Sequence, residues 1–307
     1  MGTDTVLVTG GAGFIGSTMA TRLLANSDVI IVDNMFSGRQ DNVPDDATVV
    51  EGDLSEDQTY EKLDGYDIDV VFHLAGQSSG EKSFDDPEYD FESHVVSTFK
   101  LLRWCHANDI ERFLYASSMS VYGDPDDLPV DEDHPADPKT YYAAGKLGAE
   151  AYVNLFDNLG MNTTIFRLFS VYGPGQNMRN MKQGMVSIYL SFVLNGEELL
   201  IKGPMERFRD FVYIDDVADA WLSARSEPAT YGETYNLARG VRVEVSELVN
   251  TMLDCYGEPD YPVTVADGTP GDQFGIYGDA TKLNRDLGWS PSVSLEEGLM
   301  RMIESES

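Results

Sequence analysis

A tyrosine and a lysine four residues apart have the spacing that lets one side chain change the acidity of the other. The segment YYAAGK, residues 141–146, holds two tyrosines and one lysine. Each residue of an α-helix turns by about 100°, which puts Tyr142 about 40° from Lys146 and Tyr141 about 140° away. A phenol needs roughly 4 kcal/mol of help to act as a base near neutral pH, and an ammonium group one turn away gives such help. If the segment is helical, Tyr142 is the candidate acid/base and Lys146 its partner.

A hydroxyl group could complete this site from a neighbouring strand. The run RFLYASS, residues 112–118, has the composition of a strand and ends at Ser118. A helix packed beside this strand end could present Tyr142 to the serine. A Tyr-x-x-x-Lys pair alone is common on protein surfaces, so the prediction depends on the order of the motifs along the chain.

A glycine-rich loop near the N-terminus has the spacing of a dinucleotide-binding turn. The motif TGGAGFIG, residues 9–16, follows an apolar strand and begins a helical pattern. Gly10 permits a tight turn, Gly13 lets backbone N–H groups approach a pyrophosphate, and Gly16 allows close helix–strand packing. A helix-capping loop without a ligand is the alternative interpretation.

An acidic residue at the end of the second predicted strand indicates which dinucleotide binds. Asp33 lies 20 residues after Gly13 and ends the run DVIIVD. A carboxylate here can hold the ribose hydroxyls of NAD, and it repels the additional phosphate of NADP. Asp53, after the third predicted strand, could contact the adenine end. The pattern therefore predicts NAD as the cofactor.

The elements that must position these residues alternate between strands and helices. Helical patterns occupy about Phe14–Ala25 and about Glu88–Ala107, and the YYAAGK helix follows. This alternation predicts an α/β protein with a Rossmann-type doubly wound parallel sheet and helices on both faces. The predicted strands cover residues 5–10, 28–33, 47–53, 69–76, 112–118 and 162–169.

After about Tyr172 the elements become shorter, and Pro and Gly are more frequent. This change predicts a smaller C-terminal domain that covers the substrate. We assign residues 1–170, with about 206–240, to the NAD-binding domain. We assign about 171–205 and 241–307 to the substrate-binding domain.

The chain is strongly acidic, with 53 Asp and Glu against 21 Lys and Arg and a formal net charge of −32. Such a charge repels nucleic acid, and its scatter along the chain suits a surface adapted to high salt, as in a halophilic source. The segment from Met161 to Arg209 differs, because it holds six basic and three acidic residues. A small polyanion could dock there; surface pairing by chance is the alternative.

Cysteine usage and hydropathy limit the compartment and the partners. Cys105 and Cys255 are too few for a disulfide framework or a zinc cage, so we predict no metal site. No apolar run approaches the roughly 18 residues of a membrane span, and no leader pattern precedes the first strand. These features predict a cytoplasmic protein without a membrane partner.

Taken together, the motifs resemble the extended short-chain dehydrogenase/reductase family, and within it the nucleotide-sugar epimerases such as UDP-glucose 4-epimerase. The resemblance runs almost from end to end. It is carried by TGGAGFIG, HLAG at 73–76, SSMSVYG at 117–123, YYAAGK, RLFSVYGPGQ at 167–176, RDFVYIDDVADA at 209–220 and DATKLNRDLGWSP at 279–291.

The resemblance implies residue roles and partners. Ser118, Tyr142 and Lys146 match the catalytic triad of the family, whose members often dimerise through a helix pair that would here include the YYAAGK helix. The implied partners are a nucleotide-sugar substrate and a second copy of the chain. The implied cofactor-binding residues are Gly10, Gly13, Phe14, Ile15, Gly16, Asp33, Asn34, Asp53, Leu54, Leu74, Ala75, Gly76, Tyr142 and Lys146. The implied substrate-binding residues are Ser118, Ser170, Arg209 and Asp272.

The implied reaction is a reversible oxidation of the sugar. Tyr142 takes the proton of a sugar hydroxyl while hydride passes to NAD, Ser118 supports the hydroxyl, and Lys146 holds the nicotinamide ribose. The keto-sugar then turns about its pyrophosphate and takes the hydride back on its other face. A nucleotide-sugar dehydratase and a net dehydrogenase or reductase are the alternatives; a non-catalytic NAD-sensing protein would be expected to lack a triad residue.

Some positions depart from the family pattern. Dehydratases and decarboxylases carry an acid just after the catalytic hydroxyl, where this chain has Met119-Ser120-Val121, so the sequence favours epimerisation. Ser170 and His94 stand where the family has asparagine, and we expect His94 to be a structural hydrogen-bonding residue. Thr269 replaces the arginine of Arg-x-Gly-Asp, for which Arg179 or Lys182 could compensate. These departures leave the identity of the sugar and the base open.

Overall fold

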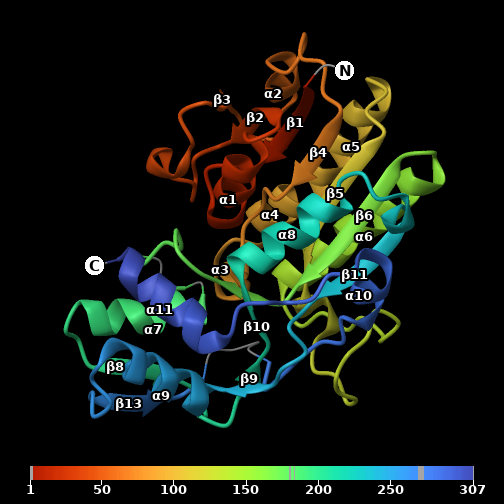
Figure 1. The fold of residues 1–307 in the computed structure, drawn as a ribbon. Helices are drawn as coiled ribbons and strands as arrows, with labels where there is room; N and C mark the ends of the chain where they lie inside the picture. The colour runs from red at the N-terminus through yellow and green to blue at the C-terminus, as the bar shows by residue number, and fades with distance from the viewer. Residues whose placement is uncertain (1–2, 180, 183, 269–272, 307) are drawn as a thin grey trace.

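A seven-stranded parallel sheet forms the centre of the computed structural model, which describes residues 3–179, 181–182, 184–268 and 273–306 (Figure 1). The strand order is β11-β6-β5-β4-β1-β2-β3. In the register, Val8 of β1 lies opposite Ile31 of β2 and Phe72 of β4. The order reverses between β1 and β4, the place where a doubly wound sheet opens a binding crevice. The strands are β1 (Asp4–Thr9), β2 (Ser27–Asp33), β3 (Thr48–Glu51), β4 (Val70–His73), β5 (Arg112–Ser118), β6 (Asn162–Leu168) and β11 (Glu233–Leu237).

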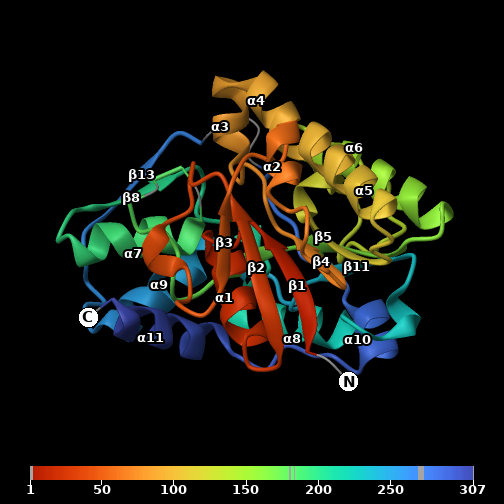
Figure 2. The same cartoon turned by 90° about the horizontal axis from the view of Figure 1, so that it is seen from above.

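Helices cover both faces of this sheet, as the sequence predicts (Figure 2). Strand side chains alternate between the two layers, so Val8 packs with Met19 of α1 and Trp221 of α8, while Leu7 packs with Leu101 of α5. Within the described ranges, no helix is long and apolar enough to cross a membrane. The helices are α1 (Phe14–Leu23), α2 (Asp57–Glu61), α3 (Gly80–Asp85), α4 (Pro87–Phe91), α5 (Ser97–Ala107), α6 (Tyr141–Asn158), α7 (Met185–Leu194), α8 (Ile214–Ala224), α9 (Val245–Tyr256), α10 (Thr281–Leu287) and α11 (Leu295–Ser305).

A separate apolar core lies beside the large sheet. It includes Leu190 of α7, Met252 of α9 and Leu299 of α11, and these helices gather with β8 and β13 at the lower left of Figure 1. We propose this core as the centre of the predicted substrate-binding domain. The short strands pair as β7 (Ser170–Tyr172) with β10 (Phe211–Tyr213), β9 (Phe208–Arg209) with β12 (Val243–Glu244), and β8 (Leu199–Lys202) with β13 (Val263–Ala266).

Two features differ from the predicted elements. The helix expected over about 88–107 contains a π-helical turn at Glu92–Val96, between α4 and α5. This wider turn places His94 in the interior, where Gly145 of α6 makes room for its side chain. The strand β11 pairs with β6 and extends the six predicted strands to seven. Its sequence, ETYNL, lacks the apolar run that marked the others.

Candidate functional site

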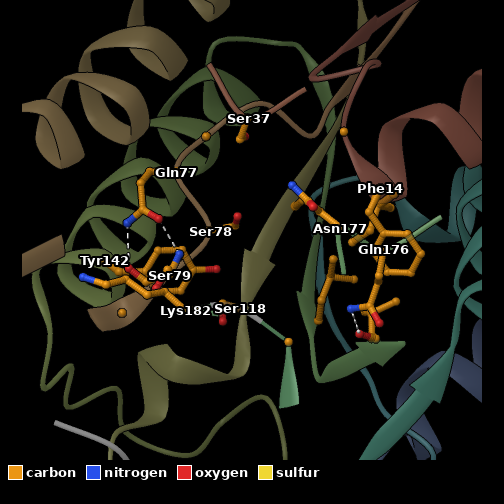
Figure 3. Close-up of a pocket in the computed structure, with 18 of the residues that line it drawn as sticks. Phe14, Ser37, Gln77, Ser78, Ser79, Ser118, Tyr142, Gln176, Asn177 and Lys182 are labelled. Carbon is orange, nitrogen blue, oxygen red and sulfur yellow. Dashed lines mark hydrogen bonds between the residues drawn. The ribbon is translucent and has the colours of Figure 1, made fainter. Parts of the chain in front are cut away.

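A cleft of about 670 Å³ opens at the carboxyl ends of the central strands (Figure 3). Its wall is built by the glycine-rich loop after β1, by the segments that follow β2 to β5, and by the start of α6. Every predicted site residue lines it except Asp272, which lies outside the described residues. Thr269 lies outside them as well.

The glycine-rich loop leaves no room for side chains. Gly10 has a φ of +70°, and a Cβ there would lie 2.8 Å from the backbone of Ala75. A Cβ on Gly16 would lie 2.1 Å from the Gly10 carbonyl oxygen. The Gly13 N–H donates to that same oxygen at 3.0 Å, and α1 begins at the next residue. A helix N-terminus attracts phosphate, so this cradle fits the pyrophosphate of NAD.

The end of the cleft next to this loop carries acidic and amide groups. Asp33, at the end of β2, accepts hydrogen bonds from the backbone N–H groups of Ala12 and Met35 at 3.0 and 2.9 Å. Burial raises the pKa of Asp33, and these two hydrogen bonds oppose the rise. Asn34 donates to Asp53 Oδ2 at 2.8 Å. The adenosine half of NAD fits here, and Asp33 could accept its ribose hydroxyls.

Tyr142 and Ser118 both line the cleft (Figure 3). Tyr141 is not among the residues that line it. The side chain of Thr140 caps α6 by accepting a backbone N–H at 3.1 Å, which fixes the start of the helix. Tyr141 is half exposed, and its ring packs on Phe84 with a centroid distance of 5.5 Å. The helix therefore has the register that the Tyr142–Lys146 spacing requires.

Burial has the largest effect on the pKa values of Tyr142 and Lys146. It raises the pKa of Tyr142; the contact with the Ser118 hydroxyl lowers it, and the negative charge of Asp90 raises it further. Lys146 is buried and its Nζ donates to the Ala116 carbonyl oxygen at 2.8 Å. Burial lowers the pKa of Lys146 to about 8, so the group is mostly an ammonium at pH 7. The expected lowering of the Tyr142 pKa by Lys146 stays a prediction.

Another part of the cleft, here called the basic end, carries two arginines, Arg207 and Arg209. Arg209 is buried and donates to the carbonyl oxygens of Phe208 and Gln273, both at 2.7 Å. Burial and the nearby charge of Arg207 lower the pKa of Arg209 to about 10. Two adjacent guanidinium groups repel each other, and a bound polyanion would relieve this repulsion. Ser170 also lines this end.

The basic segment predicted from the sequence is divided in the structure. Lys182, Lys202, Arg207 and Arg209 line the cleft. Arg167 instead forms a buried ion pair with Glu150, at 2.8 Å, because its strand β6 points it toward α6. It therefore contributes to packing rather than to the basic end.

Comparison with known proteins agrees with this geometry. A family model described as the NAD dependent epimerase/dehydratase family matches residues 6–238. The chain belongs to this family. It is 35% identical over 306 residues to a UDP-glucose 4-epimerase of Mycolicibacterium smegmatis, covering 97% of each chain. The solved structure of a Thermotoga maritima UDP-glucose 4-epimerase with UDP-glucose has a TM-score of 0.94 at 32% identity, covering 98% of each chain. That of a Thermus thermophilus UDP-glucose 4-epimerase with NAD has a TM-score of 0.91 at 30% identity, again covering 98% of each chain.

Like other members of the epimerase/dehydratase family, this protein uses NAD as its cofactor. Sequence reasoning missed further residues at the adenosine end, namely Phe36, Ser37, Arg39 and Asn42. They belong to the loop after β2, where no periodic pattern marks individual positions. Arg207 could have been predicted, because it lies in the basic segment two residues before Arg209.

His94 differs from its expected role. It is buried beside Tyr142, but neither ring nitrogen has a hydrogen-bond partner of normal geometry among the described residues. Burial and the charge of Lys146 lower the pKa of His94 well below its ordinary value, and the backbone of Gln77 opposes this. In the described part of the chain, no three His, Cys, Asp or Glu side chains are grouped as metal ligands.

Proposed function

We propose that this protein interconverts the 4-epimers of a nucleotide sugar of the UDP-glucose/UDP-galactose type, with NAD bound as its cofactor. The observation that carries the proposal is that one cleft brings three groups together. The glycine cradle, the pair Tyr142 and Ser118, and the arginines Arg207 and Arg209 all line it, so cofactor and nucleotide sugar can meet at the phenol. The names of the related proteins support UDP as the nucleotide.

Each residue of the site has a distinct task in this mechanism. When bound, NAD accepts a hydride from the sugar carbon and returns it. Tyr142 takes the hydroxyl proton at its phenol oxygen and later gives it back, and Ser118 orients the same hydroxyl. Lys146, fixed by the Ala116 carbonyl, holds its positive charge beneath the reacting centre. Because the cofactor is regenerated, no second substrate is consumed.

The basic end could keep the keto-sugar bound to the protein while the sugar rotates. Arg207 and Arg209 would hold the pyrophosphate by charge-assisted hydrogen bonds, which are among the strong ones. Binding energy placed on the nucleotide leaves the sugar free to rotate. A 4-keto-sugar could then present either face to the cofactor.

A net dehydrogenase or reductase remains the second candidate, because it would use the same triad. A dehydratase is less well supported: Met119 and Ser120 line the cleft where those enzymes carry an acid. The test is to incubate the purified protein with UDP-, dTDP- and GDP-sugars and to follow them by NMR. We expect a 4-epimer to form without NADH absorbance; accumulating NADH would overturn epimerisation in favour of net oxidation.

We further propose a cytoplasmic homodimer joined through α5 and α6. The supporting observation is an apolar face along α6, on which Tyr141, Leu155 and Leu159 are each about half exposed. Phe91 of α4 is 55% exposed at one end of this face. Contiguous exposed apolar surface of this kind is typical of an interface.

A further inference from the structure

Asp90 and His94 form a buried polar pair behind the proposed catalytic residues. Asp90 lies in α4 and His94 lies in the π-helical turn that follows, and each is 1% exposed. Asp90 Oδ1 lies 3.6 Å from His94 Nε2. Asp90 Oδ2 and both ring nitrogens of His94 lack hydrogen-bond partners among the described residues. Unpaired buried polar atoms lower the stability of the folded protein, so a functional role would explain the presence of this pair.

The imidazole packs directly on Tyr142. The two rings meet edge to face, with centroids 5.3 Å apart and an angle of 75°. Gly145 and Gly76 bound the other sides of the ring: a Cβ on Gly145 would lie 3.2 Å from His94 Cβ, and a Cβ on Gly76 2.8 Å from His94 Cε1. The imidazole is thus confined between two glycines, and it in turn confines the phenol ring.

The pair also lies near the catalytic lysine. A Cβ on Gly76 would lie 2.8 Å from the His94 ring and 3.5 Å from Lys146 Nζ, so both side chains border the same glycine. The negative charges of Asp90 and Glu150 raise the pKa of Lys146. The charge of Glu150 is already matched by Arg167, whose Nη2 lies 2.8 Å away. Asp90 Oδ1 accepts a hydrogen bond from the neutral amide of Gln77 at 2.9 Å. Asp90 is therefore the carboxylate better placed to balance the ammonium.

The two histidines near Asp90 are neutral, and Lys146 is its cationic neighbour. His73 faces His94 from β4, and burial lowers the pKa of His73 to about 3. Burial and Lys146 lower the pKa of His94 well below its ordinary value, so the imidazole is uncharged at pH 7. Burial raises the pKa of Asp90, whereas Gln77 and Lys146 lower it.

We propose that Asp90 and His94 are a positioning pair: His94 holds the ring of Tyr142 in place, and Asp90 supplies the negative charge that faces Lys146. The inference rests on the proposed roles of Tyr142 and Lys146. Neither member of the pair touches the reacting atoms, so both act through the catalytic side chains.

Asp90→Asn tests the electrostatic half of this proposal. It preserves the shape and an oxygen that can accept from Gln77, and it removes the charge. Because the Asp90 charge raises the pKa of both Tyr142 and Lys146, its loss should move both limbs of the pH profile of kcat/KM to lower pH. Glu88→Gln, an exposed change on the same helix, should leave the profile in place.

The Tyr142 phenol can also be titrated without turnover. The probe is the NAD-bound protein with ¹³Cζ-labelled tyrosine, observed by NMR, with the signal assigned by Tyr142→Phe. Asp90→Asn should move this titration to lower pH. If the Tyr142 phenol titrates at the same pH in Asp90→Asn as in the wild type, the pair has only a structural role and the inference is overturned. A lowered melting temperature of the variant would not change this conclusion.

His94→Ala tests the ring contact. Freeing the phenol ring should lower kcat about tenfold, within the ~100-fold that a misplacement of 1 Å can cost, while KM for the sugar nucleotide stays unchanged. His106→Ala, an exposed change on α5, is the matched control. An undiminished kcat in a folded His94→Ala variant contradicts the positioning role. Full activity of Tyr142→Phe would instead overturn the proposed function itself, so the two failures are distinguishable.

Discussion

At the residue scale, the adjacent tyrosines give a direct test of the acid/base assignment. Tyr142→Phe keeps the ring against His94 but removes the phenol oxygen, so turnover should fall at least ~100-fold. Tyr141→Phe should leave turnover within a few-fold, because that ring is half exposed and packs on Phe84. Both variants are assayed beside circular dichroism and NAD titration. A dead Tyr141→Phe variant, or two active variants, would show that the phenolate mechanism is wrong.

Arg209 also gives a prediction at this scale. Arg209→Ala should weaken nucleotide-sugar binding by roughly 1.5–3 kcal/mol, the range for hydrogen bonds to charged groups, and should leave NAD affinity unchanged. Calorimetry with UDP and with NAD measures the two affinities separately.

The control for this prediction is Arg242→Ala. Arg242 stacks on Phe208, 4.3 Å from the ring centroid, without lining the cleft. Because Arg209 also holds the Gln273 carbonyl, a lowered melting temperature is expected in Arg209→Ala. Impaired NAD binding with intact UDP binding would reverse the assignment.

The spacing of residues along the chain predicts pairs that are close in sequence. It does not predict pairs that form between separate elements. The four-residue interval between Tyr142 and Lys146 fixes their shared helix face, so the register follows from the sequence. The effect of the Asp90 charge on the pKa of Lys146 depends on how the π-helical turn packs against α6, which no periodic pattern encodes. Arg167 shows the same limit: it belongs to the basic segment, but its partner Glu150 is on another element, so the sequence does not reveal the pair.

At the element scale, the α/β alternation was sufficient to predict the parallel sheet and its two helical layers. A strand that is buried on both faces has a nearly continuous apolar run, which can be recognised in the sequence. The strand β11 lacks an apolar run and joins the sheet edge through its pairing with β6, so only the tertiary context reveals it. The π-helical turn before α5 likewise has no marker in the helical pattern of the sequence.

The α6 face gives the prediction at this scale. Leu155→Glu places a charge on the exposed apolar face and should convert the proposed dimer to a monomer, because burying an unpaired carboxylate in an interface is costly. Asn154→Glu adds the same charge one residue earlier, about 100° around the helix, and should leave the dimer intact. Light scattering after size-exclusion chromatography measures the mass. A wild type that elutes as a monomer, or a Leu155→Glu variant that stays dimeric, would rule out this interface.

At the scale of the whole molecule, charge is distributed unevenly. The net charge is −32, and acidic residues crowd exposed stretches such as residues 124–137. The arginines Arg207 and Arg209 are buried at the cleft instead. The acidic surface groups therefore repel one another, while the basic end of the cleft attracts anions.

This distribution predicts opposite effects of salt on stability and on binding. Raising KCl from about 0.1 to about 2 M shortens the screening length from about 10 Å to below about 3 Å, so the repulsion among surface carboxylates should fade and the melting temperature should rise. The affinity for UDP should fall over the same range, because the same ions screen its attraction to Arg207 and Arg209. Thermal unfolding by circular dichroism and UDP titration at each concentration measure both, with sucrose as an uncharged control. A variant whose exposed aspartates in 124–137 are replaced by asparagine should melt with a weaker dependence on KCl. A melting temperature that ignores KCl, or a UDP affinity that rises with it, would mean that surface repulsion and cleft attraction do not govern this molecule.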